Sequence, residues 1–375
     1  MSVDKKEIIC VVGARPNFTK IAPIMAAMLE HGKHIKPYLL HTGQHYDEAM
    51  KDSFFKQLGI PEPDCDLEVG SGSHAVQTAE VMKRFEPVLD ERNPAAILVV
   101  GDVNSTIACA LVASKKHIPV IHVEAGLRSY DRDMPEEINR VLTDQISDLL
   151  YTTERSAHDN LAKEGIAVEK VQFVGNVMID TLMKNVEKAM PMDETLSAIS
   201  GHEEFQGKEF GLVTMHRPSN VDDEKVLSSL IDSLLEISQK LPLIFPVHPR
   251  TEGNLEKFGL MGKLREGNVL ILPPLGYLHL LGFMKNAKVV LTDSGGIQEE
   301  TTALGVPCIT LRENTERPIT AVEGTNTIVG TDPEKIRLAF NDVMETGGKA
   351  GRVPEYWDGK AADRIVAHLD SVFGN

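Results

Sequence analysis

Charged and polar side chains follow several short apolar runs of this chain, at the point where each run ends. They are Arg15, Asp102, Glu124, His216, His248 and the segment 293–296. If the runs are strands of parallel sheets, these side chains lie at the carboxyl ends of the strands, where open α/β sheets bind ligands. Cations at such a place can bind an anion, and carboxylates can exchange protons with it. The pattern therefore predicts a catalytic cleft.

The turn Ser294-Gly295-Gly296 precedes an apolar helical segment and predicts an anion-binding site. Small residues let backbone N–H groups approach a ligand, and the N-terminus of a helix favours negative charge. A serine helix cap followed by two glycines is the simpler alternative. Two basic turns, one with Arg15 and Lys20 and one with Arg317, favour a diphosphate as the anion. No Walker lysine follows the glycines, which argues against an NTPase.

Two further motifs lead us to expect neither a nicotinamide cofactor nor a metal. Gly70-Ser-Gly72 has the spacing of a dinucleotide fingerprint, but the segment before it, 64–69, is too charged for a central strand. A glycine loop near the cleft is expected there instead. His122 and Glu124 have the spacing of a metal pair, yet no Asp/His triad accompanies them. A buried, hydrogen-bonded histidine is therefore expected at position 122.

The elements that must position these side chains alternate between strand and helix patterns. In the first half, the runs 8–12, 95–100 and 119–123 are short and continuously apolar, and a second series starts near Gly211. Such runs are typical of parallel sheets that helices cover on both faces. We therefore predict an α/β protein with two doubly wound, Rossmann-like domains, a linker over 193–208 and the site in the interdomain cleft. Glu136 and Glu137, after Pro135, by themselves indicate only the start of a helix.

Composition and charge exclude several classes of protein. The 375 residues suffice for two domains, and 42% hydrophobic with 25% charged residues is ordinary for a globular chain. A net charge of −16 disfavours nucleic acid and anionic membrane surfaces as partners. No apolar run approaches the roughly 20 residues of a spanning helix, and the run near the N-terminus is too short for a signal peptide. We expect a cytoplasmic protein whose four widely spaced cysteines are reduced.

The motifs also occur in the order found in a known enzyme family. From about residue 7 to about residue 372 the chain resembles the non-hydrolysing UDP-N-acetylglucosamine 2-epimerases. The shared motifs are Gly13–Pro23, His41–His45, Gly101-Asp102, His122–Arg128, Met134–Arg140, Gly175-Asn176, Met215–Pro218, Pro246–His248, Thr292–Glu300, Asn314–Pro318 and Glu323–Thr325. The first turn differs, because it has Gly-Ala and then Arg15-Pro16-Asn17 where Gly-Thr and Arg-Pro-Glu are commoner. Relatives that act on more modified UDP-amino sugars share the same core motifs.

The resemblance implies a glycosyltransferase-B-like fold, a homodimer, and reversible conversion of UDP-N-acetylglucosamine to UDP-N-acetylmannosamine for surface polysaccharide synthesis. The implied domains are 1–175, with a C-terminal helix over 358–375 that packs back on it, and the UDP-binding domain 176–357. Asp102, Glu124, Glu136 and His216 match the family's catalytic positions. The positions expected to bind the UDP-sugar are Arg15, Lys20, Arg217, Ser294, Gly295, Gly296, Glu300 and Arg317. Gln44, His45 and His248 match an activator site, although the segment 66–74 contains no Arg or Lys.

We expect the reaction to proceed by elimination of UDP to a 2-acetamidoglucal, followed by re-addition, with no cofactor. Three other functions compete with this interpretation. A glycosyltransferase of the same fold would need an acceptor, and a hydrolysing epimerase would release N-acetylmannosamine and UDP. A UDP-sugar sensor is disfavoured, because a pure binder would not place three carboxylates beside a diphosphate.

Overall fold

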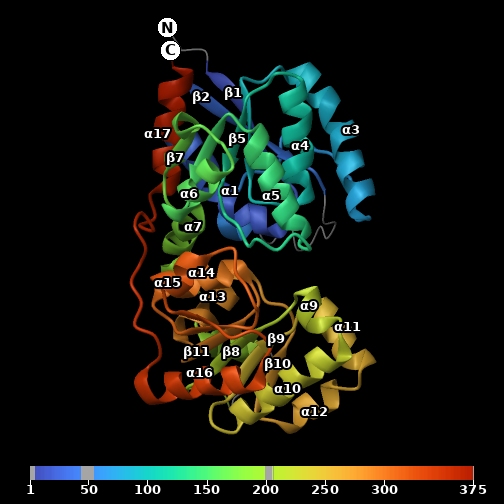
Figure 1. Ribbon diagram of the computed structural model, residues 1–375, viewed down its shortest axis with the longest axis vertical. Coiled ribbons are helices and arrows are strands. Elements are labelled where there is room, and N and C mark those ends of the chain that lie inside the picture. The colour runs from blue at the N-terminus through green and yellow to red at the C-terminus, as the bar shows by residue number, and fades with distance from the viewer. Residues whose placement is uncertain (1–4, 44–54, 199–204, 206, 375) are drawn as a thin grey trace. The chain divides into compact units, whose positions relative to one another are not determined.

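The structure is a computed structural model that describes residues 5–43, 55–198, 205 and 207–374. The chain divides into two compact units, the first formed by Met1–Lys184 with Glu355–Asn375 and the second by Asn185–Pro354 (Figure 1). The sequence places these boundaries at 175/176 and 357/358. The polar segment 193–208 is not the linker that we expected, because it lies inside the second unit. Its residues 193–198 belong to a helix of that unit, α8 (Met192–Ala198).

The first unit contains a seven-stranded sheet in which all strands are parallel, with the order β3-β2-β1-β4-β5-β6-β7. Every position of β4 and β5 is buried. Helices cover both faces of such a sheet, so its central strands are continuously apolar. The strands are β1 (Lys6–Val12), β2 (Ile35–His41), β3 (Cys65–Asp66), β4 (Ala96–Val100), β5 (Val120–Val123), β6 (Leu149–Thr152) and β7 (Val171–Phe173).

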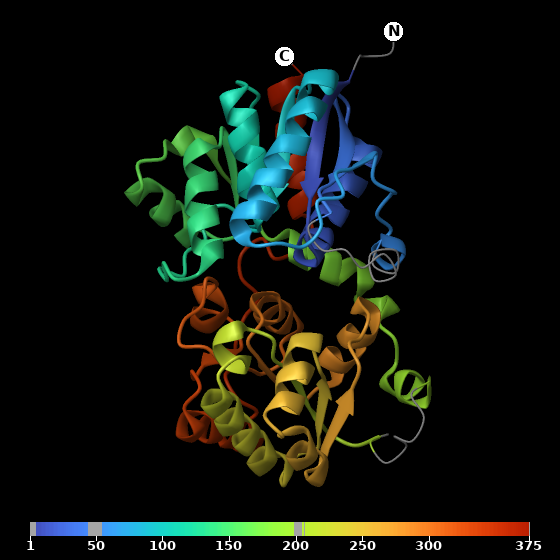
Figure 2. The same cartoon turned by 90° about the vertical axis from the view of Figure 1, so that its right-hand side faces the viewer.

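Two groups of helices cover this sheet (Figure 2). In one group α1 (Arg15–His31) contacts α17 (Ala361–Phe373), and both contact β2. In the other, α4 (Asn104–Lys115) lies between α3 (His74–Arg92) and α5 (Pro135–Ile146) and contacts both. The remaining helices of the unit are α6 (Ser156–Lys163), η1 (Val168–Lys170) and α7 (Val177–Asn185).

The C-terminal segment is part of the first unit. The carboxylate of Asp180 accepts hydrogen bonds from the amides of Ala361 and Ala362, at 3.1 and 2.7 Å, and so holds the N-terminus of α17. The indole of Trp357, which is 1% exposed, donates to the carbonyl of Thr153 at 3.1 Å. These contacts tie the end of the chain to elements formed almost two hundred positions earlier.

The second unit contains a six-stranded parallel sheet with the order β10-β9-β8-β11-β12-β13. The strands are β8 (Gly211–Thr214), β9 (Leu243–Pro246), β10 (Val269–Leu272), β11 (Val289–Thr292), β12 (Cys308–Thr310) and β13 (Asn326–Ile328). The helices are η2 (Val186–Lys188), α8 (Met192–Ala198), α9 (Pro218–Val221), α10 (Glu224–Ser238), α11 (Pro249–Lys257), α12 (Met261–Glu266), α13 (Tyr277–Asn286), α14 (Gly295–Leu304), α15 (Pro318–Val322) and α16 (Pro333–Thr346).

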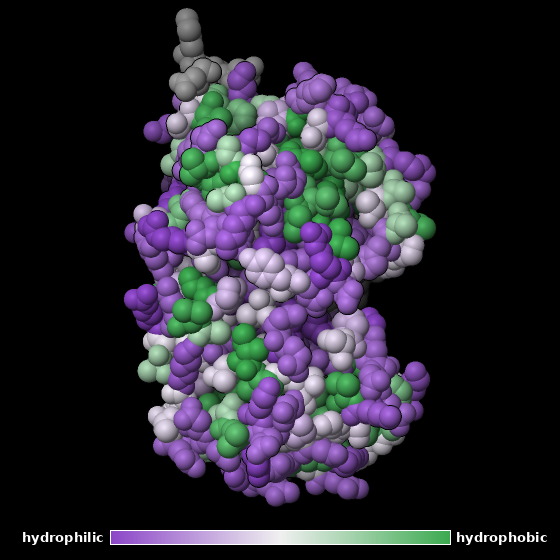
Figure 3. Space-filling model, viewed as in Figure 1, coloured by the Kyte–Doolittle hydropathy of each residue, from purple (hydrophilic) through white to green (hydrophobic). Residues whose placement is uncertain are grey.

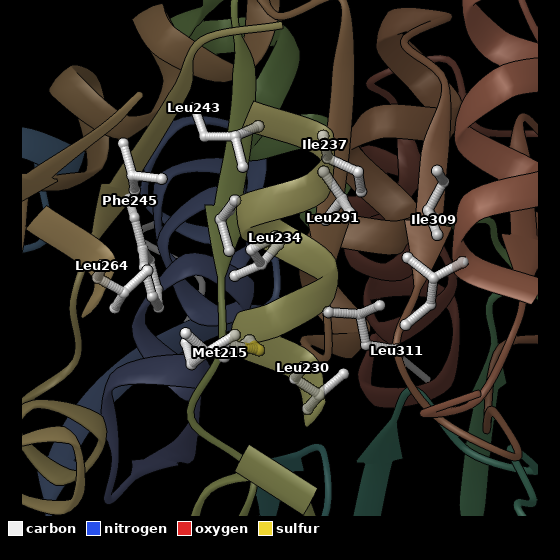
Figure 4. Packing of buried hydrophobic residues seen from close by; sticks show 14 of the residues in the cluster. Met215, Leu230, Leu234, Ile237, Leu243, Phe245, Leu264, Leu291, Ile309 and Leu311 are labelled. Carbon is white, nitrogen blue, oxygen red and sulfur yellow. The ribbon is translucent and has the colours of Figure 1, made fainter. Parts of the chain in front are cut away.

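The core of the second unit lies between α10 and the sheet. Figure 4 shows Leu230, Leu234 and Ile237 of this helix against Phe245 and Leu291 of the strands, all at most 3% exposed. Burying one such side chain contributes about 1.5–3 kcal/mol. The carboxylate of the residue before the helix, Asp223, accepts from two amides of its first turn and fixes where it starts.

The predicted fold class is confirmed, since both units are doubly wound α/β structures. Strand order turns back between β1 and β4 in the first unit and between β8 and β11 in the second. Ligands bind beyond the carboxyl ends of strands at such switch points. All four cysteines are free, as expected. Of the helices in the described ranges, none has the length and apolar character that a membrane span requires.

Candidate active site

The first turn of the first unit is built around a buried asparagine. Asn17 is 2% exposed; its Oδ1 accepts from the amides of Gly13 and Ala14 at 3.0 and 3.1 Å, and its Nδ2 donates to the carbonyl of Val100 at 2.9 Å. A carboxylate at this position has no N–H to donate to that carbonyl. Asn17, which stands where the commoner motif has Glu, therefore connects the turn after β1 to the end of β4. Arg15 is the first residue of α1, so its backbone directly follows this turn.

Lys20 and Glu124 form a buried ion pair at the carboxyl ends of β4 and β5. Their side chains are 7% and 3% exposed, and the Nζ of Lys20 contacts the Oε2 of Glu124. Glu124 has a positive φ of 71°, a conformation that L-residues adopt rarely and that is concentrated at functional sites. Gly101, at φ 68°, makes room for the pair: a Cβ there would lie 2.9 Å from that Nζ and 3.3 Å from that Oε2. The sequence predicted both charged residues but not their pairing.

Asp102 follows Gly101 and is held by α5. Its Oδ2 accepts from Arg140 Nη2 at 2.5 Å and from Arg140 Nε at 3.2 Å. Arg140 also donates to Oε2 of Glu137 at 2.5 Å. Glu136, the third predicted carboxylate, stands in the first turn of the same helix and is partly exposed. The first unit thus places Asp102, Glu124 and Glu136 on three segments that converge at the carboxyl end of its sheet.

His122 is the buried, hydrogen-bonded histidine that the sequence predicted. It is 0% exposed, and its Nδ1 and Nε2 lie 2.7 Å from Oδ1 of Asp144 and 2.8 Å from the carbonyl of Gly101. The ring therefore supports the turn that carries Asp102. In the chain as described by the structure, no group of three or more His, Cys, Asp and Glu side chains could hold a metal ion.

In the second unit, Asp293 organises the turn that carries His216 and Arg217. Its carboxylate accepts from the amides of both residues, at 2.9–3.1 Å, and lies 3.2 Å from Nδ1 of His216. Burial raises the pKa of Asp293, but the hydrogen bonds and charge of His216 and the amide of Arg217 outweigh it, so this pKa lies below its usual range. The rings of His216 and His248 lie 5.5 Å apart.

The predicted anion turn begins α14. Ser294 is its N-cap residue, with Gly295 and Gly296 in the first turn, so their amides are available to a ligand at the positive end of the helix. A Cβ at Gly295 would lie 2.8 Å from the guanidinium of Arg317, which is therefore immediately beside the turn. Arg317 is 6% exposed and pairs with Glu316 at 2.7 Å and Glu299 at 2.9 Å. Cation and amides together can bind a diphosphate.

Glu300 lies one turn further along α14 and is 4% exposed. Its Oε1 accepts from the hydroxyl of Tyr277 at 2.8 Å. A carboxylate fixed in this way can accept hydrogen bonds from the hydroxyls of a ribose.

Several residues of the site were missed by the sequence analysis, namely Glu137, Arg140, Tyr277, Asp293 as an organiser and Glu316. Glu137 and Arg140 stand in the motif Met134–Arg140, so the signal was present, but the spacing of a helix start explained it equally well. Gln44 and His45 of the expected activator site lie outside the described residues. The glycine loop at Gly70 follows β3, a two-residue edge strand, and so has no dinucleotide-binding position.

Comparison with known proteins gives consistent relatives over nearly the whole chain. A family model described as "UDP-N-acetylglucosamine 2-epimerase" matches residues 27–370. A UDP-N-acetylglucosamine 2-epimerase of Methanococcus maripaludis is 44% identical, covering 97% of both chains. A UDP-2,3-diacetamido-2,3-dideoxy-D-glucuronate 2-epimerase of Pseudomonas aeruginosa is 39% identical, covering 97% of this chain and 99% of the relative. The crystal structure of Methanocaldococcus jannaschii UDP-GlcNAc 2-epimerase with UDP-GlcNAc and UDP is 40% identical, covers 97% of this chain and 99% of that one, and superposes with a TM-score of 0.89.

Proposed function

Because this chain belongs to the UDP-N-acetylglucosamine 2-epimerase family, we propose that it interconverts UDP-N-acetylglucosamine and UDP-N-acetylmannosamine. The observation that carries the proposal is that acid/base groups lie at the switch point of one sheet and anion-binding groups at the switch point of the other. The first unit gathers Asp102, Glu124 and Glu136, and the second gathers Arg217, Arg317 and the amides of α14. In this proposal the carboxylates of the first unit act on the sugar, and the cations and amides of the second unit bind the diphosphate.

The chemistry explains why both sets of groups are needed. The C2 proton of an N-acetylhexosamine is not adjacent to a carbonyl, so its removal must be coupled to departure of the anomeric UDP. In the forward step a carboxylate takes the C2 proton, the C2–H electron pair forms the C1=C2 double bond, and the C1–O electron pair leaves with UDP. In the return step a proton adds to the opposite face of C2, and UDP attacks C1. The intermediate is the 2-acetamidoglucal.

The residues divide between these steps according to their charge. Arg15, Lys20, Arg217 and Arg317 neutralise the departing diphosphate, together with the amides of Gly295 and Gly296. Asp102, Glu124 and Glu136 exchange the C2 proton and stabilise positive charge on the ring, with His216 as a further acid/base group. Epimerisation requires proton exchange on both faces of C2, so more than one of these groups acts in each turnover. Glu300 binds the ribose.

Exchange of the C2 hydrogen with solvent tests this mechanism. In D2O, with UDP-N-acetylglucosamine and no added cofactor, proton NMR of the product should show deuterium at C2. Glu124→Gln or Glu136→Gln removes a proton acceptor and should lower turnover by about 10²–10⁴-fold. The matched control is Glu169→Gln, an exposed carboxylate of the same unit, which should retain full turnover. Fully converted product that retains protium at C2 would refute the mechanism.

The same reaction separates the competing functions. A glycosyltransferase would leave UDP-N-acetylglucosamine unchanged until an acceptor is added, and a hydrolysing epimerase would accumulate free N-acetylmannosamine. The Pseudomonas aeruginosa relative is named for a diacetamido glucuronate substrate, so a parallel reaction with that UDP-sugar determines which amino sugar is preferred.

We further propose that the protein is a cytoplasmic homodimer that uses an apolar surface of the first unit. Val76 of α3 and Ile138 and Leu142 of α5 are 59%, 41% and 49% exposed. Ile138 also lines a groove of about 440 Å³ between these helices, and the apolar surface is visible over α3–α5 in Figure 3. Exposed apolar surface of this kind marks an interaction site. Sedimentation should show a dimer, and Leu142→Lys should yield monomers.

A second UDP-sugar site is the remaining part of the proposal. His248 starts α11 beside His216, and Gln44 and His45 are its expected partners. The segment 66–74 supplies no cation, and loss of one cation from a diphosphate site weakens binding by about 1–3 kcal/mol. We therefore expect pure UDP-N-acetylmannosamine to react without a trace of the gluco epimer. A strict requirement for that trace would contradict this expectation.

A further inference from the structure

We propose that Glu137 and Arg140 are positioning residues of the epimerisation, which together hold the three segments that carry Asp102, Glu124 and Glu136. This inference rests on the proposed function. Neither residue belongs to the groups that we expect to touch the substrate. Both are buried, with side chains 2% and 4% exposed, on the face of α5 opposite Ile138 and Leu142.

Arg140 connects α5 to the segment after β4. Its guanidinium donates to Oδ2 of Asp102 through both Nη2 and Nε, and it donates to Glu137 through Nη1. The neighbouring residue Asn139 donates to the backbone carbonyl of Asp102 at 2.9 Å. A planar guanidinium can hold two carboxylates at once because its donors point in fixed directions. The Asp102 carboxylate is thereby fixed in orientation as well as in position.

Glu137 connects α5 to the segment after β5. Its Oε2 accepts from the amide and the hydroxyl of Ser129, both at 3.0 Å, and its Oε1 accepts from the amide of Tyr130 at 2.8 Å. These residues lie in the middle of the loop that joins β5 to α5 and starts with Glu124. Because Glu136 precedes Glu137 directly, any movement of this anchor also moves the third carboxylate.

The loop requires such an anchor because its backbone is strained. Glu124, Gly126 and Tyr130 have φ of 71°, 79° and 59°. Non-glycine residues in this region are strained, and they persist only where neighbouring contacts hold them. α5 supplies several of the contacts here: Asp144 accepts from the amide of Gly126 at 3.0 Å, and Glu137 accepts from the amide of Tyr130 at 2.8 Å, while the amide of Glu124 donates to the carbonyl of Tyr151 in β6 at 3.0 Å. α5 therefore holds the loop that follows Glu124, in addition to Asp102 and Glu136.

Catalytic groups must be held within about 0.5 Å of the productive geometry, and misplacement by about 1 Å can cost 10²-fold in rate. Arg140→Lys retains the positive charge, but one ammonium cannot reproduce the forked contacts with Asp102 and Glu137. We expect kcat to fall by about 10–100-fold while the Kd for UDP stays within about 3-fold, because the second unit supplies most of the groups proposed to bind UDP. UDP and the glycal should also escape more often per turnover, because the intermediate is held less firmly.

Two comparison variants separate positioning from general stability. Arg364→Lys changes a second arginine of the same unit whose guanidinium also makes forked contacts, because it donates to both carboxylate oxygens of Asp358 and to the carbonyl of Val174. It should lower the Tm but leave kcat within about 3-fold. The double variant Glu137→Gln/Arg140→Lys should lose no more than about 3-fold beyond the worse single variant, because groups that act as a unit are not additive.

Each outcome of this series decides between the two proposals. A wild-type protein without epimerisation or C2 exchange would refute the proposed function, and this inference would fall with it. An active wild type with a fully active Arg140→Lys variant would refute the inference alone. Equal losses of kcat in Arg140→Lys and Arg364→Lys, or a Kd for UDP that rises in step with the loss of kcat, would show a merely structural role and overturn the inference.

Discussion

Replacing Gly101 with Ala adds one methyl group beside the buried pair of Lys20 and Glu124. The new Cβ would lie 2.9 Å from the ammonium nitrogen of Lys20, closer than carbon and nitrogen atoms approach without a bond, so the ammonium must move by roughly 0.5 Å. The backbone φ of 68° costs an alanine about 1–2 kcal/mol in addition. We expect kcat to fall by about 10–100-fold, since sub-ångström displacement of groups in the site is enough for such losses.

The loss of stability should be small by comparison. The first unit contains about 200 residues, and for domains of this size 1 kcal/mol corresponds to about 2–4 °C in Tm. The backbone term therefore predicts a decrease of about 2–8 °C for Gly101→Ala. Thermal unfolding, followed by circular dichroism, and the C2 exchange assay should be measured on the same preparations.

Gly165→Ala is the matched control for this prediction. Gly165 lies in the same unit at φ 81°, and a Cβ there meets nothing within 4 Å. It should lose the same 2–8 °C and keep its turnover. If both variants lose turnover equally, or if Gly101→Ala retains it, then the close approach of Gly101 to the ion pair is not important for the reaction.

Two further predictions concern the remaining parts of the structure. Tyr277→Phe removes the hydroxyl that donates to Glu300, so it should weaken UDP binding by about 3–10-fold and leave kcat unchanged. Calorimetry measures the affinity for UDP. An unchanged affinity would contradict a role of Glu300 in ribose binding. Burial raises the pKa of Asp180 from 3.8 to about 6, although the amides of Ala361 and Ala362 favour its charged form. An acid whose pKa is raised in the folded state stabilises the fold fully below its unfolded pKa, and this contribution is lost as the pH rises through 6. When the pH is lowered from 7 to 4.5, the free energy of unfolding of the wild type should therefore increase by about 2 kcal/mol relative to that of Asp180→Asn. A difference between their unfolding curves that stays constant over this range would contradict it.

The fold could be predicted where a strand is buried on both faces. The runs at β1, β4, β5, β8, β9 and β11 are continuously apolar and end in glycine or polar residues, so both their existence and their carboxyl ends were evident. α3 was missed, because it buries only a narrow stripe, namely Gln77, Val81, Phe85 and Leu89, and Pro87 interrupts its pattern. The strands β6, β7, β10 and β13 were missed as well, because they lie at or beside the edges of their sheets, where the strands are incompletely buried.

The candidate site could be predicted as a set of residues but not as a network. The residues of the turns were found because their positions after strands are a property of the local sequence. Their partners were not found, because Lys20 pairs with a residue 104 positions away and Asp102 with one 38 positions away. Glu137 shows the limit most clearly: a carboxylate in the first turn of a helix is favoured by the helix dipole alone, so its contacts with Ser129 and Tyr130 leave no trace in the pattern.

The membership of α17 in the first unit has a consequence for the order in which the protein folds during synthesis. All seven strands of that unit lie within its first 173 residues, but Trp357, Ile365 and Leu369, each at most 1% exposed, are translated after the whole of the second unit. A ribosome synthesises roughly 5–20 residues per second. The surface of α1 and β2 that α17 covers therefore stays exposed for on the order of ten seconds or more before α17 is made. The second unit is continuous in sequence and can fold during that interval. Chaperones that recognise exposed apolar surface therefore have a defined period in which to bind the nascent first unit, and premature termination before residue 355 leaves that surface permanently open.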